Sequence, residues 1–220
     1  MTQRLLRMSP LTLILGCALA TVSARAQEGD DPQAQREPVA VTHALPHQTM
    51  TNDEIRRTTV NYTVPAIKMV RDDGTRVSLD TELNDGRPVV LNFIYTSCTT
   101  ICPLSSQEFS QLQQRLGADR DKVHLVSISI DPEEDTPARL RSYARHFHAG
   151  KEWQHYTSTQ AESVRAQQAF HVYRGAKMDH TPVTLLRATP DSNWVRFDGF
   201  VTADELYAEL RNVRDLRAAR

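Results

Sequence analysis

The chain has 220 residues, of which 40% are hydrophobic and 24% are charged, a composition that supports one sizeable core but hardly two. Its 26 basic and 27 acidic side chains leave a formal net charge of −1. From the length and composition we expect a single globular domain. The charge balance lacks the basic excess of nucleic-acid-binding proteins, so we expect no nucleic-acid partner.

The first 26 residues have the pattern of an export signal. Arg4 and Arg7 supply a positively charged start. A short apolar segment over residues 11–22 follows, and Ala-Arg-Ala at 24–26 is a small-x-small cleavage site. We predict an exported, periplasmic protein whose signal peptide spans residues 1–26. Two alternatives stay open, an uncleaved segment that tethers the protein to the inner membrane and a lipid attached to Cys17.

The next segment differs from the rest of the chain in its composition. Residues 27–58 carry proline, glutamine and threonine with little periodicity, which predicts a flexible N-terminal arm. The folded domain is then expected over residues 59–220. At its front, residues 64–70 and 76–79 flank the turn sequence Arg-Asp-Asp-Gly, which favours a β-hairpin.

A pair of cysteines follows the most apolar run of the domain. Residues 89–94 predict a buried strand, and Cys98 and Cys102 come directly after it, where we expect a helix to begin. A helix N-terminus favours thiolate, the form that attacks disulfides and ligates soft metals. At this spacing on a helical turn, both sulfurs would share one face, which suits a bridging ion or a disulfide after slight adjustment. A purely structural disulfide is the less favoured reading, because so short a loop constrains the unfolded chain little.

The elements alternate after the cysteines. We predict that the helix that begins at the cysteines ends near Gly117, and that further helices span residues 138–148, 160–170 and 202–210. Strands are predicted over residues 123–130, 153–157, 183–186 and 194–200. This order predicts an α/β fold, a thioredoxin-like three-layer sandwich with an N-terminal β-hairpin extension. It places the cysteines at the carboxyl end of the first core strand, where open sheets bind ligands. Thioredoxins have two residues between their cysteines, whereas this chain has three.

Three motifs stand in order along the domain: Tyr95-x-x-Cys98-x-x-x-Cys102-Pro103, Ser129-Ile-Asp131-Pro132-x-x-Asp135-Thr136-Pro137 and Asp179-His180-Thr181. Together they resemble the SCO/SenC family of copper-binding cytochrome c oxidase assembly proteins, from about residue 62 to residue 210. The resemblance implies that Cys98, Cys102 and His180 bind one copper ion per chain, as Cu(I) or Cu(II). It also implies that the protein delivers copper to, or reduces, the binuclear copper site of a respiratory oxidase.

The chemistry of the side chains agrees with these implied roles. Two thiolates are soft ligands for Cu(I), and one neutral imidazole completes a three-coordinate site that can release its ion. Asp179 is a candidate to orient the His180 ring. The expected partners are the copper-site subunit of a cytochrome oxidase or another periplasmic copper protein, together with thiol-disulfide exchange partners.

The thiols also support a second class of function. In a thiol-disulfide oxidoreductase, Cys98 and Cys102 would be the catalytic residues and would close into a redox disulfide, while His180 would matter little. A redox sensor without a copper-delivery role is a further alternative. A peroxidase is disfavoured because Tyr95 stands where peroxiredoxin-like enzymes place a threonine or serine. The residues alone leave open whether the protein is an enzyme.

Overall fold

The computed structural model describes residues 55–218, with side chains to residue 213. The predicted signal peptide and nearly all of the predicted arm lie outside the described residues. None of the helices between residues 55 and 218 combines the length and the apolar character that crossing a bilayer requires.

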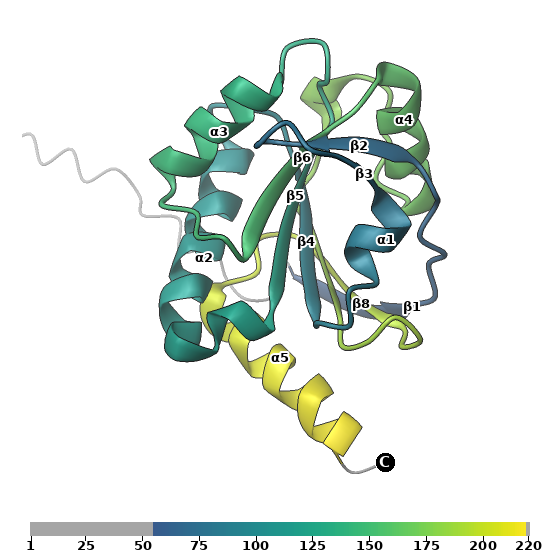
Figure 1. The fold of residues 1–220 in the computed structure, drawn as a ribbon. Helices are drawn as coiled ribbons and strands as arrows, with labels where there is room; N and C mark the ends of the chain where they lie inside the picture. The colour runs from purple at the N-terminus through teal and green to yellow at the C-terminus, as the bar shows by residue number, and fades with distance from the viewer. Residues whose placement is uncertain (1–54, 219–220) are drawn as a thin grey trace, which may run out of the picture. The chain divides into compact units, whose positions relative to one another are not determined.

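One eight-stranded sheet organises the domain, in the order β1-β8-β7-β4-β5-β6-β2-β3 (Figure 1). Its strands are β1 (Arg56–Val60), β2 (Lys68–Arg71), β3 (Arg76–Ser78), β4 (Val89–Ile94), β5 (His124–Ser129), β6 (Trp153–Thr157), β7 (Val183–Arg187) and β8 (Trp194–Asp198). The central strands β4, β5 and β6 run parallel, while β7 is antiparallel to β4 and to β8. This mixed sheet with helices on both faces confirms the predicted thioredoxin-like class.

Helices cover both faces of the sheet. They are α1 (Leu79–Leu83), α2 (Ile101–Leu116), α3 (Pro137–His146), α4 (Gln160–Ala169) and α5 (Ala203–Ala218), with short 3-10 helices η2 (Gly117–Lys122) and η3 (Lys177–Asp179). In Figure 1, α2 and α5 lie on one side of the central strands and α1 and α4 on the other. The side-chain oxygens of Thr136 and Thr159 cap α3 and α4 by accepting backbone N–H groups, which fixes where these helices begin.

The central strands are buried on both faces. Every residue of β4 and β5 is buried, as a near-continuous apolar run in a parallel sheet predicts. Because side chains alternate along a strand, Leu91 and Phe93 enter one apolar cluster while Val90 enters the other. The sheet is therefore a rigid platform from which the loops at its carboxyl edge project.

Three features differ from the prediction. The hairpin is confirmed as β2 and β3, but the sheet gains another strand, β1, which begins at Arg56 inside the expected arm and pairs with β8. Its polar sequence, Arg-Arg-Thr-Thr-Val, carries no apolar signal because β1 is an edge strand. The helix α1 was not predicted. The final helix α5 extends to Ala218, beyond the predicted end.

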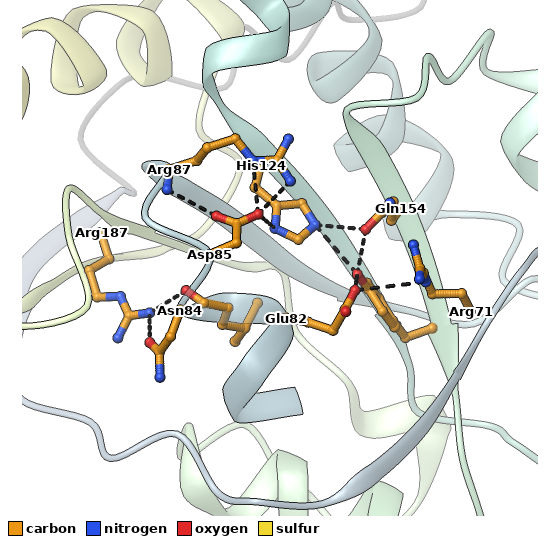
Figure 2. Close-up of polar contacts among 10 residues, drawn as sticks. Arg71, Glu82, Asn84, Asp85, Arg87, His124, Gln154 and Arg187 are labelled. Atoms are coloured by element: carbon orange, nitrogen blue, oxygen red, sulfur yellow. Dashed lines mark hydrogen bonds and ion pairs between the residues drawn. The ribbon is translucent and has the colours of Figure 1, made fainter. Parts of the chain in front are cut away.

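A polar network lies at the amino ends of β4 and β5, whereas the cysteines follow the carboxyl end of β4. Figure 2 shows its contacts. His124 is buried, and its two ring nitrogens face Asp85 Oδ2 at 3.3 Å and Gln154 Oε1 at 3.0 Å. The Tyr156 hydroxyl donates to Glu82 Oε2 at 2.7 Å, and Arg87 pairs with Asp85. These contacts fasten α1 and the turn before β4 to β5 and β6.

Candidate metal and thiol site

The two cysteines lie where the chain leaves the central strand β4. Cys98 is in the turn between β4 and α2, and its N–H donates to the Tyr95 carbonyl at 3.1 Å. Cys102 is the second residue of α2. The prediction that both occupy one helical turn was therefore wrong for Cys98, which precedes the helix. The sulfurs nevertheless stay close, since the Cys102 N–H donates to Cys98 Sγ at 3.4 Å. Both cysteines are buried free thiols.

The surroundings of the two thiols separate their acidities. Burial opposes ionisation of Cys98, but N–H groups of Cys102 and Thr100 and the side chains of Cys102 and Tyr95 stabilise its thiolate and lower its pKa to about 7. Cys102 is more deeply enclosed, and burial raises its pKa far above the ordinary value. Cys98 is therefore the more readily ionised thiol of the pair.

Tyr95 adds a hydroxyl group to this site. Burial, and then the hydrogen bond to Cys98, raises the pKa of Tyr95 to about 12, so the phenol stays protonated. Met178 Sδ lies 3.7 Å from the same oxygen and is the alternative acceptor for its one proton. The sequence motif contained Tyr95, but no role followed from it, and nothing in the sequence singled out Met178.

His180 lies between η3 and β7 and is buried. Its Nε2 donates to the backbone carbonyl of Phe93, on β4, at 3.0 Å, which leaves Nδ1 with its lone pair free for a ligand. Burial lowers the pKa of His180, which keeps the imidazole neutral at neutral pH. The Phe93 carbonyl, rather than Asp179, orients the ring, since Asp179 is exposed and no hydrogen bond joins it to His180 in the described structure.

The structure brings the two cysteines together but does not close a three-ligand site. Within residues 55–218, no group of three or more His, Cys, Asp or Glu side chains is arranged to hold a metal ion. His180 is nonetheless anchored to the strand that leads into the cysteine turn. The three predicted ligands therefore lie on adjoining segments at the carboxyl edge of β4.

Two acidic residues join the neighbouring loops to this edge. Asp135 is fully buried, and its carboxylate accepts hydrogen bonds from Thr96 N and Thr96 Oγ1 and, at 2.7 Å, from Ser129 Oγ. Asp131 forms an ion pair of 2.5 Å with Lys177, on η3. A cavity of about 230 Å³ lies along this pair and is lined also by Arg174 and His180. The loop that carries His180 is thus fastened beside the thiols.

The fold and the paired thiols, with a neutral imidazole nearby, define a thioredoxin-like thiol protein. The sequence profile of SCO1/SenC matches residues 56–214, so the chain belongs to the SCO1/SenC family. It is 36% identical over 88 residues to the SCO1 protein homolog of Bacillus subtilis, covering 40% of this chain and 45% of that protein. It is 31% identical over 144 residues to the mitochondrial SCO1 homolog 1 of Arabidopsis thaliana, and the match covers 60% of this chain and 40% of that protein. The matches therefore span less than half the length of these curated relatives.

Solved structures agree with the family assignment. BsSco, a member of the Sco family of cytochrome c oxidase assembly proteins with an identified disulfide switch, superimposes with a TM-score of 0.60 at 25% identity, over 72% of this chain and 97% of that one. Bradyrhizobium japonicum ScoI with copper bound superimposes with a TM-score of 0.55 at 28% identity, over 66% of this chain and 96% of that one. Arabidopsis thaliana ScoI with copper bound superimposes with a TM-score of 0.58 at 26% identity, over 71% of this chain and 99% of that one.

Proposed function

We propose that this chain is an exported copper-binding thiol protein that delivers copper to, or reduces the cysteines of, the binuclear copper site of a respiratory cytochrome oxidase. Copper is its cargo, one ion per chain, held by Cys98, Cys102 and His180. The observation that carries the proposal is the pair of adjoining thiols beside a neutral histidine, in a family that includes copper-bound relatives.

The donor set fits a soft cargo ion. Thiolates prefer Cu(I), and an imidazole with a free Nδ1 lone pair suits either oxidation state of copper. The hydrogen bond from Nε2 to Phe93 leaves that lone pair unused. Binding by all three side chains requires His180 or the turn carrying Cys98 to move, because the described structure does not gather them around one point.

Metal analysis of anaerobically purified variants tests the proposal. The wild-type protein is expected to carry one copper per chain with both thiols blocked, and Cys98→Ala, Cys102→Ala and His180→Ala are each expected to lose tight binding. His146→Ala, which removes an exposed histidine of α3, is the matched control and keeps its copper. Stoichiometric, tightly held copper in His180→Ala would count against the proposal.

The acidity difference between the thiols favours a second candidate, a thiol-disulfide oxidoreductase or redox sensor without a copper-delivery role. A thiol with a pKa near ambient pH, such as Cys98, is well suited to attack a disulfide and expel one of its thiolates. Cys102 would then have to lose its proton to attack the mixed disulfide and release the second thiolate, and its raised pKa makes this the slower step. In that case either cysteine is essential to the exchange rate while His180→Ala leaves it unchanged. Exchange rates and copper affinities measured on the same variants separate the two functions.

Export is the remaining part of the proposal. Cleavage after Ala26 gives a mature protein that begins at Gln27, and retention of the segment gives a protein tethered to the inner membrane. N-terminal sequencing of protein from periplasmic and membrane fractions distinguishes these forms. A cytosolic protein that keeps residues 1–26 would refute export.

A further inference from the structure

An exposed methionine stands at the outer edge of the thiol site. Met178 lies on η3, two residues before His180, and its residue is 76% exposed. Among the described residues, Leu104 and Tyr173 are the other large apolar side chains that face solvent. A methionine left this exposed contributes little buried apolar area to the stability of the fold. Its position is therefore better explained by what its sulfur contacts.

The thioether of Met178 and the thiol of Cys98 share one neighbour. The Tyr95 oxygen lies 3.7 Å from Met178 Sδ. The same hydroxyl is among the groups that stabilise the Cys98 thiolate, so its one proton serves one sulfur at a time. Met178 Sδ therefore lies next to a side chain that also acts on Cys98. Methionine has three rotatable bonds, and an exposed side chain can swing its sulfur past the hydroxyl toward Cys98.

The loop that carries Met178 also carries His180. The Lys177–Asp131 ion pair holds η3 at the carboxyl edge of the sheet, and the Lys177 ammonium lies 5.8 Å from the centre of the Tyr95 ring. Any movement of this loop that brings His180 toward the cysteines therefore brings Met178 with it. A thioether is a neutral, soft donor that suits Cu(I) better than Cu(II) or Zn²⁺.

We propose that Met178 Sδ is an additional ligand for Cu(I), joining Cys98 on the solvent side of the site. The inference rests on the proposed copper-binding function and extends it to the route by which the ion enters and leaves. The step is a ligand exchange, in which the ion stays Cu(I), the neutral thioether lone pair binds or leaves, and no electron is transferred.

Selenium spectroscopy of the full-length protein tests the contact directly. Protein labelled with selenomethionine is loaded anaerobically with one equivalent of tetrakis(acetonitrile)copper(I), and the selenium X-ray absorption spectrum is recorded. We expect a copper scatterer in the selenium spectrum of the wild-type protein that disappears in Met178→Leu. Met50→Leu is the matched control and retains it. A protein that holds one copper per chain without a selenium–copper contact would overturn the inference and leave the proposed function intact.

Affinity measurements provide a second readout. Competition with a chromophoric Cu(I) chelator is expected to give roughly tenfold weaker binding in Met178→Leu, a substitution that keeps apolar volume and removes only the donor atom. An unchanged affinity, coupled to weaker binding of a copper-accepting protein, would instead make Met178 part of a docking surface and would refute the ligand role. Wild-type protein that binds no copper through its cysteines would refute both the inference and the proposed function.

Discussion

The two cysteines differ more in their surroundings than in their positions along the chain. Cys98 receives N–H donors in a turn, whereas Cys102 is enclosed at the start of α2. Their place after a buried strand was predictable from the sequence, because an apolar run followed by cysteines is a local pattern. The split in their pKa values was not, since it depends on which N–H groups point at which sulfur.

The reactivity of Cys98 should follow its lowered pKa. A pKa of about 7 predicts that alkylation of Cys98 by iodoacetamide rises to half its limiting rate near pH 7 and levels off above about pH 8. Cys102 stays unmodified over this range. Peptide mapping by mass spectrometry after timed quenching measures both rates. In Tyr95→Phe, loss of the hydroxyl donor should shift the midpoint for Cys98 upward, and a midpoint unchanged from wild type would contradict the role given to Tyr95.

The histidine illustrates a limit of reasoning from motifs. The Asp-His pair suggested that Asp179 orients the ring, yet the ring is held by the Phe93 carbonyl. A backbone carbonyl carries no sequence signature, so only the approach of the loop to β4 could reveal this partner.

At the scale of elements, Asp135 joins the turns that follow β4 and β5. Its buried carboxylate satisfies the Thr96 N–H after β4 and the Ser129 hydroxyl at the end of β5. The motif with Asp135 was visible in the sequence, but nothing in it indicated which donors this carboxylate accepts from. The buried bonds across two strands emerge only when parallel strands end side by side.

Removing this carboxylate should destabilise the whole domain. Asp135→Ala leaves the Thr96 and Ser129 donors buried without an acceptor, and we expect the free energy of unfolding to fall by about 2 to 4 kcal/mol in urea titrations. Glu134→Ala, one residue earlier and exposed, is the control, with an expected change below about 0.5 kcal/mol. Equal losses in the two variants would show that the buried bonds contribute nothing specific.

The network at the other end of the sheet makes a pH-dependent contribution. Burial alone would raise the pKa of Asp85, but hydrogen bonds from His124 and Arg87 outweigh it and hold the pKa well below the ordinary value (Figure 2). A carboxyl group with a depressed folded-state pKa stabilises the fold above its unfolded-state pKa of about 4, and this contribution is lost as the pH falls.

The variant Asp85→Asn isolates that contribution. We expect it to lower the free energy of unfolding by on the order of 1 kcal/mol at pH 5, with the gap from wild type narrowing as the pH falls from 4 to 3. Denaturant titrations at each pH measure the gap. A gap that widens on acidification would reverse the assigned sign.

Element prediction succeeded where burial imposes a pattern and failed where it does not. The sequence predicted β4 and β5 from their apolar runs, and it predicted the starts of α3 and α4, which the structure shows to be capped. The edge strand β1 was missed because its side chains are half in solvent, and α1 because it is a single short helix.

At the scale of the molecule, a cargo ion that binds only the folded chain must stabilise it. Cu(I) buffered at a hundred times its dissociation constant should add about 2.7 kcal/mol to the free energy of unfolding. Thermal melts under nitrogen would show this as a raised midpoint that a Cu(I) chelator returns to the metal-free value. The double variant Cys98→Ser, Cys102→Ser should melt at one temperature with or without copper, and a copper-induced rise in that variant would point to binding elsewhere.

The sequence contains two tryptophans, and the sheet separates them. Trp194 packs in the cluster that also contains the cysteines, against Phe170, whereas Trp153 belongs to the cluster beneath α2 and α5. Each is at most 2% exposed. Each face of the sheet thus contains its own fluorophore. In variants that keep only one tryptophan, the fluorescence during unfolding would show whether the cluster around Trp194, which includes the cysteines, unfolds before the cluster around Trp153.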